Sequence, residues 1–139
     1  LHNSLGTVLM QGGRGSDAIE AFTAAVQLEP GSVVSRLNLG SAWFAAQRWP
    51  AAVEQFSAAL KLRPDDAATQ LKLAVAMVNA GAIAEAVPWF ESYLRLNPDA
   101  DETREQFAQV LRALGRTREA LAQLDLAADI RSRRRVTRP

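Results

Sequence analysis

The sequence predicts an all-α protein in which about four antiparallel helix-turn-helix units stack into an α-solenoid. The chain has 139 residues, is rich in alanine, and contains only 6% aromatic residues. Alanine costs the least free energy in a helix, so this composition favours closely packed helices. Pro30, Pro64 and Pro98 are spaced 34 residues apart, and each closes a helix-like run. Recurrence at one fixed period is the signature of a repeat architecture.

The 34-residue period aligns several columns of similar residues. One column holds small residues, namely Gly6, Gly40, Ala74 and Ala108. A second is invariant and consists of Ala18, Ala52, Ala86 and Ala120. Two columns hold large residues, which are Leu9, Trp43, Met77 and Leu111 in one and Phe22, Phe56, Phe90 and Leu124 in the other. We expect small residues to let two helices approach closely and large residues to fill the space between hairpins.

Residues that are expected to end helices place the helices in order along the chain. The pattern predicts helices near 1–12, 16–29, 33–46, 50–63, 67–80, 84–97, 101–114 and 117–133. Gly13, Gly81 and Gly115 share a column in which Gln47 is the exception, and each glycine is expected to end a helix in a left-handed conformation. We expect one domain over 1–132, with repeats at about 1–32, 33–66, 67–100 and 101–132, followed by a basic tail over 133–139.

The best-preserved copy resembles the tetratricopeptide repeat through Leu39, Gly40, Trp43, Ala52, Phe56, Ala59 and Pro64. The resemblance covers about residues 1–132 and implies a right-handed solenoid. Arg36 stands where the family has an early Trp, and Tyr93 replaces the alanine that the other copies have at 25, 59 and 127. The fourth copy departs furthest, since it has Phe107 and Ala108 in place of Leu-Gly and Ser132 in place of the closing Pro.

The resemblance implies a concave groove lined by the first helix of each hairpin. The residues expected to line it are Asn3, Thr7, Val34, Leu37, Asn38, Ser41, Phe44, Leu71, Lys72, Val75, Val78, Glu105, Gln109 and Arg112. The middle of this surface is apolar and its ends are polar, which suits an apolar peptide or helix. Alternatively, these side chains pack beneath the adjacent helices. Asn38 and Lys72 match only two positions of the clamp with which some family members hold a C-terminal carboxylate, so that mode is disfavoured.

The sequence offers no catalytic, cofactor-binding or metal-binding constellation, so we expect no enzyme activity and no cofactor. The chain has no cysteine, and its single histidine, His2, has no second histidine as a partner. The segment 12–15 is glycine-rich, but it falls at a hairpin turn and lacks the context of a phosphate-binding loop. Asp99 and Asp101 lack the glycine and distant glutamate of a calcium loop, and we expect one of them to cap a helix.

Charge is distributed unevenly along the chain. Five arginines lie within residues 131–139, whereas the rest of the chain has 11 basic and 15 acidic residues, a net charge of −4. We interpret the arginine run as a solvated, disordered end, and nucleic-acid binding is disfavoured because no aromatic residues alternate with the arginines. The chain begins with Leu1, which indicates a piece of a longer protein, and it shows no signal peptide or apolar run of about 20 residues. The cytoplasm is favoured as its compartment, with the periplasm as the alternative.

The sequence therefore predicts a non-catalytic scaffold that binds a peptide or helical segment of a partner protein in its concave groove. The alternative is a substrate-presenting or oligomerisation region of a larger multidomain protein such as an enzyme. Solenoids usually need a polar capping element at each end, and nothing after residue 133 is expected to form one. We therefore expect either that the parent protein continues beyond residue 139 or that the uncapped ends of the solenoid associate with another copy.

Overall fold

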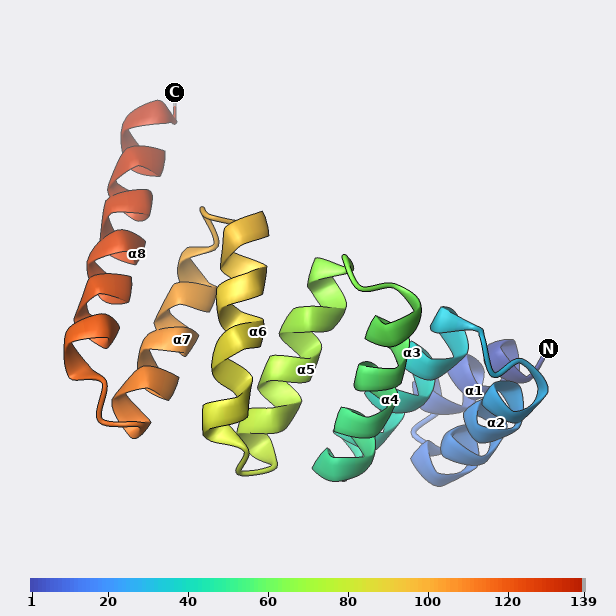
Figure 1. Ribbon diagram of the computed structural model, residues 1–139. Coiled ribbons are helices and arrows are strands. Elements are labelled where there is room, and N and C mark those ends of the chain that lie inside the picture. The colour runs from blue at the N-terminus through green and yellow to red at the C-terminus, as the bar shows by residue number, and fades with distance from the viewer. Residues whose placement is uncertain (139) are drawn as a thin grey trace.

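The protein is a single stack of four helical hairpins in the computed structural model, which describes residues 1–138. Within that range the chain forms eight helices and no strand: α1 (His2–Gln11), α2 (Gly15–Leu28), α3 (Val33–Ala45), α4 (Trp49–Leu62), α5 (Ala67–Asn79), α6 (Ile83–Leu96), α7 (Asp101–Ala113) and α8 (Thr117–Thr137). The hairpins follow one another in a row from α1 to α8, with the two termini at opposite ends (Figure 1). The predicted all-α solenoid is confirmed.

Close contact between the two helices of a hairpin depends on the small-residue column. A Cβ atom added to Gly6 would lie 2.5 Å from the Phe22 ring, and one added to Gly40 would lie 2.7 Å from the Phe56 ring. Each phenylalanine therefore packs directly on the backbone of the first helix. Ala52 and its counterparts in the other hairpins are buried on the facing helix, as the sequence predicts.

The core runs without a break along the stack. Trp43 packs against both the cluster around Phe22 and the cluster around Phe56. The rings of Phe90 and Phe107 stack between the third and fourth hairpins, with centroids 5.5 Å apart and planes 13° from parallel. Because each hairpin covers the apolar face of its neighbour, stacking supplies the core that one hairpin cannot build alone.

A repeated hydrogen bond fixes each connection between hairpins. Arg36, Gln70 and Arg104 donate to the carbonyl oxygens of Pro30, Pro64 and Pro98 at 2.9, 3.0 and 3.1 Å. The three donors are themselves 34 residues apart. Arg36 replaces the early Trp of the family, and its side chain ties the start of α3 to the preceding connection.

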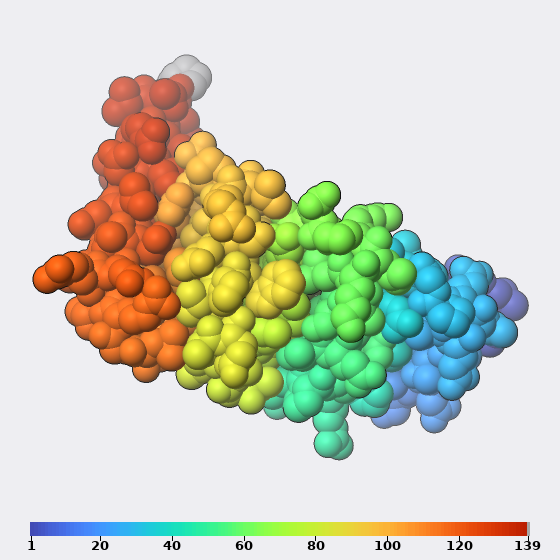
Figure 2. All heavy atoms as spheres, in the orientation of Figure 1, coloured from blue at the N-terminus to red at the C-terminus, as the bar shows by residue number. Residues whose placement is uncertain are grey.

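The last helix is longer than the sequence suggests. α8 continues beyond residue 133 to Thr137, and its final turns project past the ends of α6 and α7 (Figures 1 and 2). The expectation of a disordered basic end is therefore wrong for residues 133–137, while Pro139 lies outside the described residues. Arginine is a good helix former, and its positive charge is favourable near a helix C-terminus.

Each hairpin turn contains one residue with a left-handed backbone. Gly13, Gly81 and Gly115 have φ values of 74°, 86° and 74°, and Gln47 has a φ of 57° in the same column. The sequence prediction for the three glycines is confirmed. Gln47 occupies a conformation that glycine adopts at no steric cost.

We expect Gln47→Gly to stabilise the protein by about 1 kcal/mol, because a side chain with a Cβ is penalised by about 1–2 kcal/mol in the left-handed region. Urea unfolding followed by far-UV circular dichroism measures the change. Ala46→Gly is the matched control, since Ala46 has a φ of −80° and gains nothing from glycine. A midpoint for Gln47→Gly at or below that of the wild type would contradict this account of the turn.

Candidate binding groove

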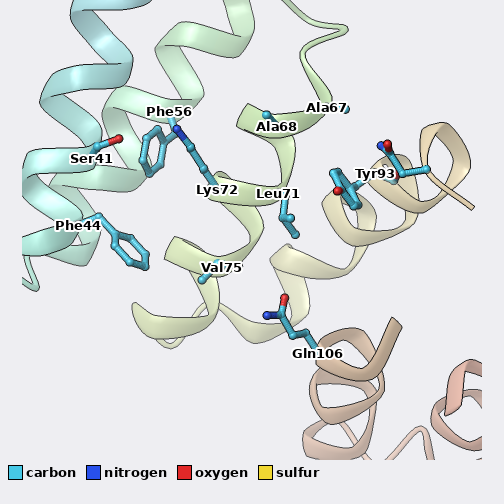
Figure 3. A pocket seen from close by; sticks show the side chains of 11 residues that line it. Ser41, Phe44, Phe56, Ala67, Ala68, Leu71, Lys72, Val75, Tyr93 and Gln106 are labelled. Carbon is cyan, nitrogen blue, oxygen red and sulfur yellow. The ribbon is translucent and has the colours of Figure 1, made fainter. Parts of the chain in front are cut away.

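A groove of about 590 Å³ crosses the middle of the stack, with α5 at its centre (Figure 3). The two helices of the second hairpin, α3 and α4, contribute one wall of the groove. Residues of α6 and α7, with Asn97 directly after α6, contribute the other wall. The lining residues are Ser41, Phe44, Phe56, Ala67, Ala68, Leu71, Lys72, Val75, Tyr93, Asn97 and Gln106. A second hollow of about 390 Å³ shares Val75 and Gln106 with the groove and leads on to Val78, Gln109 and Ala113. The two hollows together form a continuous path.

Helical spacing explains why α5 supplies the base of the groove. Ala68, Leu71 and Val75 are three and four residues apart, so they lie on one face of the helix. Leu73 and Ala76 lie elsewhere around the helix and are buried in the core around Phe56. α5 therefore has one apolar surface that builds the stack and a second that lines the groove.

Phe44 forms the wall on the α3 side, and an aromatic contact holds it there. Its ring meets the ring of Trp49 edge-on, with centroids 4.9 Å apart and planes at 70°. Edge-to-face pairs of this kind are favourable beyond the area they bury. Because Trp49 begins α4, the turn of the second hairpin restrains the position of Phe44 in the groove.

Tyr93 forms part of the opposite wall and comes from a second helix, α6. Its ring faces the side chain of Leu71 across the groove in Figure 3. Asn97 follows α6 and donates to the Tyr93 carbonyl oxygen at 3.2 Å, which adds a hydrogen bond to the end of that helix. The other three copies have alanine in this column, so the departure from the repeat was the signal in the sequence that could have identified Tyr93 as a groove residue.

The groove is apolar with a few polar groups at its edges. Among its described lining residues, Lys72 carries the only charge, while Ser41, Asn97 and Gln106 can form hydrogen bonds. An apolar pocket with a small number of polar groups is the usual composition of a ligand site. In the described part of the chain, no three His, Cys, Asp or Glu side chains gather in an arrangement that could hold a metal ion.

The structure brings together seven of the residues that the sequence assigned to the groove. The groove itself includes Ser41, Phe44, Leu71, Lys72 and Val75, and the adjoining hollow includes Val78 and Gln109. All seven come from the second, third and fourth hairpins. The sequence assignment missed Phe56, Asn97 and Gln106 in addition to Tyr93.

The residues predicted at the polar N-terminal end form contacts within the protein. The Asn3 amide donates to Ser35 Oγ at 2.8 Å, and the Asn38 amide donates to Asn3 Oδ1 at 3.2 Å. The Thr7 hydroxyl donates to the Asn3 carbonyl oxygen at 2.9 Å. The Asn3 and Asn38 side chains join α1 to α3, the Thr7 hydroxyl bonds within α1, and all three residues lie outside the two hollows.

Four further predicted residues also lie outside the two hollows. Leu37 packs against the core around Phe56, and Val34 is exposed at the start of α3. The carboxylate of Glu105 lies 2.6 Å from Arg131 on α8, and Arg112 is exposed on α7. Gln106 follows Glu105 directly and takes the place in the groove that the sequence assigned to its neighbour.

An ion-pair cluster joins α7 to α8 near the C-terminus. Arg131 Nε lies 2.7 Å from Asp101 Oδ2, and Arg134 Nη1 lies 2.8 Å from Asp101 Oδ1. The Asp101 side chain is only 9% exposed. Asp101 was expected as a possible helix cap, but the N-cap of α7 is Ala100 and the Asp101 carboxylate faces α8 instead.

The two arginines determine the titration of Asp101. Hydrogen bonding from Arg131 holds the pKa of the Asp101 carboxyl below its usual value; burial opposes this shift and Arg134 reinforces it. Hydrogen bonds to Glu105 and then Asp101 raise the pKa of Arg131 above its usual value. Arg131 and Arg134 are therefore committed to holding α8 against the start of α7.

The sequence of this chain matches the family model of the tetratricopeptide repeat over residues 3–67 and again over 37–101. The chain belongs to the tetratricopeptide repeat family. No curated protein sequence gives a significant match. Repeats of this type stack into extended concave surfaces that bind other proteins, so this tetratricopeptide chain is, in general terms, a protein-interaction scaffold.

Solved structures of MamA share the fold. A crystal structure of MamA has 23% sequence identity and a TM-score of 0.87, and the match covers 96% of this chain and 78% of that one. A second crystal structure of MamA has 22% identity and a TM-score of 0.90, with coverage of 99% and 75%. MamA from Desulfovibrio magneticus RS-1 has 14% identity and a TM-score of 0.87, with coverage of 94% and 74%. At these identities the likeness concerns the fold.

No helix within residues 1–138 of this tetratricopeptide stack has both the length and the apolar character that crossing a membrane requires. The longest described helix, α8, has 21 residues, but eight of them are acidic residues or arginines. It belongs to the stack, held by its ion pairs with α7.

We expect Asp101→Asn to lower the melting temperature at neutral pH and to have less effect in acid. The folded-state pKa of Asp101 lies below that of the unfolded chain, so its stabilisation is complete above about pH 4 and is lost as the pH falls through the folded value. Calorimetry of both proteins across the acid range tests this. The control is Asp125→Asn, an exposed change on α8, and an Asp101→Asn difference that stays constant with pH would contradict the assignment.

Proposed function

We propose that the groove binds one apolar peptide segment of a partner protein. The observation that carries the proposal is the convergence of Phe44, Leu71, Val75 and Tyr93 on one concave space (Figure 3). These side chains come from two successive hairpins, α3–α4 and α5–α6, and are positioned by the packing of the stack. An apolar hollow with a few polar groups favours a ligand that buries several apolar side chains at once.

The shape of the groove favours a linear segment over a small molecule. Its volume of about 590 Å³ accommodates several side chains, and the adjoining hollow extends the path from Ser41 to Gln109. An amphipathic helix fits such a path by placing apolar residues at positions i, i+3, i+4 and i+7 in the groove. The uncovered second hollow would then receive the next turn of the ligand.

Lys72 favours a ligand that carries an acidic group. It is the one charged side chain among the described lining residues of an otherwise apolar groove. Lys72 is exposed at the edge of the groove, and a carboxylate beside it would gain a charge-assisted hydrogen bond. Asn3 and Asn38 bond to each other at the far end of the stack, so this arrangement differs from a clamp built from several polar side chains.

Selection of displayed random peptides on the wild-type protein tests the groove directly. We expect apolar peptides with an acidic residue, and we expect Leu71→Asp to weaken the best of them by about 2 kcal/mol, or roughly 30-fold, because the change places a charge at the centre of the site. Isothermal titration calorimetry measures the affinities. Leu28→Asp, at an exposed leucine of α2 outside the groove, is the matched control and should bind normally.

Circular dichroism establishes whether Leu71→Asp remains folded, because Leu71 is partly buried. Ser41→Arg provides a second variant, since Ser41 is exposed and lines the groove. Its larger side chain would obstruct the ligand without disturbing the core. Equal binding by the wild type and folded Ser41→Arg would place the peptide site elsewhere.

We expect Tyr93→Ala to weaken the selected peptides about tenfold while the stack remains folded, because the other three repeats accept alanine in this column. Tyr93→Phe separates the ring from the hydroxyl group and should bind as the wild type does if the ring supplies the contact. Titration of the same peptides against both variants makes the comparison. Unchanged binding by Tyr93→Ala would remove α6 from the site.

The alternative role, as a substrate-presenting or oligomerisation region of a larger protein, makes use of the same surfaces. A groove that holds a peptide can present that peptide to another domain. Self-association draws on a separate set of residues, the apolar faces at the two ends of the stack, and is compatible with a ligand in the groove.

A further inference from the structure

Small residues stand at the α3 end of the groove, in columns where neighbouring hairpins have larger ones. The column of Ser41 has Val75 in the third hairpin, and the column of Ala68 has Val34 in the second. Both Ser41 and Ala68 are exposed, and both line the groove. Short side chains at these two positions leave room between α3 and α5 for a bulky side chain of a ligand.

Aromatic rings lie at the bottom and the side of this space. Phe56 on α4 is only 1% exposed and still lines the groove, so the groove reaches down to its ring. Phe44 on α3 packs against the core around Phe56, and its other contact is the edge-on pair with Trp49. Figure 3 shows Phe44 and Phe56 on the same side of the groove as Ser41. A ligand side chain that enters here meets aromatic surface.

Lys72 borders the same space from the opposite side. It follows Ala68 by four residues on α5, so both residues lie on one face of that helix. Its side chain extends towards Phe56 in Figure 3. An ammonium group is attracted to the face of an aromatic ring, most strongly where water is excluded. The charge therefore favours an aromatic side chain over an aliphatic one of similar size.

We propose that this end of the groove is an aromatic subsite that receives one aromatic side chain of the bound peptide. The subsite is defined by Ser41, Phe44, Phe56, Ala68 and Lys72. The inference rests on the proposed function of the groove and names the ligand residue that anchors there. An aromatic ring pairs with the rings of the protein and with the ammonium group, whereas leucine makes neither interaction.

The corresponding space between α5 and α7 lacks these features. Val75 and Glu102 occupy the two columns that contain Ser41 and Ala68 one hairpin earlier, and Val78 occupies the column of Phe44. The second hollow is therefore bordered by aliphatic and polar side chains at the positions that matter for an aromatic ring. A peptide that spans both hollows has one aromatic anchor at the α3 end, and that anchor sets its register along the groove.

Displayed random peptides selected on the wild-type protein give the first test. They should share an aromatic residue at one fixed position. Changing that residue to leucine in the best peptide should weaken binding about fivefold, because the apolar area is kept and only the aromatic pairing is lost. Changing it to alanine should weaken binding roughly 30-fold, as expected for the loss of a central anchor. Isothermal titration calorimetry measures all three peptides.

Ala68→Leu fills the subsite from its rim. We expect it to weaken the aromatic peptide about tenfold and to bind the alanine-substituted peptide at least as well as the wild type does, because the new side chain occupies the space of the missing ring. A loss of folding would weaken both peptides alike. Val34→Leu is the matched control, since Val34 occupies the same column in the second hairpin, is exposed and lies outside both hollows.

Phe44→Leu separates the aromatic chemistry of the subsite from its size. The variant keeps an apolar side chain on α3 and removes the ring that the ligand pairs with. We expect the preference for the aromatic peptide over the leucine-substituted peptide to fall from about fivefold to less than about twofold. Circular dichroism establishes that the variant is folded, because Phe44 is partly buried.

Two results would overturn the aromatic subsite and leave the groove in place. They are selected peptides with no aromatic residue at a fixed position, and an Ala68→Leu variant that binds the aromatic peptide as tightly as the wild type does. In both cases Leu71→Asp would still weaken the selected peptides, since Leu71 lies at the base of the groove. Binding that is unaffected by a folded Leu71→Asp variant would instead overturn the groove and the subsite together.

Discussion

The close approach of the two helices in each hairpin is the constraint on which the rest of the structure depends. It requires a residue with little or no side chain opposite an aromatic ring, as at Gly6 against Phe22 and Gly40 against Phe56. With the hairpin formed, its outer apolar faces have nothing to cover them except another hairpin, so stacking follows from the same constraint. The groove and the two end faces are consequences of that stacking.

Departures from the repeat pattern give this member of the family its individual surfaces. Tyr93 occupies a column of alanines and becomes a wall of the groove, where alanine would leave open space. Arg36 replaces a tryptophan and hydrogen bonds to the carbonyl oxygen of Pro30. A repeat tolerates such changes at positions that do not separate the paired helices, and those positions are where binding specificity can arise.

The first and last helices of the stack differ in the contacts that hold them: only α8 is joined to its neighbour by ion pairs with a buried carboxylate. At the C-terminal end, Arg131 and Arg134 hold the buried carboxylate of Asp101, so α8 is secured on the side facing α7. Its outer side retains Leu121, and the opposite end of the molecule retains Leu5 and Val8.

By itself the sequence determined the helices, the four hairpins and the family, because a 34-residue period imposes the same steric demands at the same places in every copy. It also located the middle of the groove at Leu71 and Val75. Only the tertiary structure decided that Phe56 and Tyr93 reach the groove from second helices, and that Gln106 faces it while Glu105 pairs with Arg131. Neighbouring residues on a helix point about 100° apart, so their roles depend on how the packed helices are rotated, which periodicity alone does not specify.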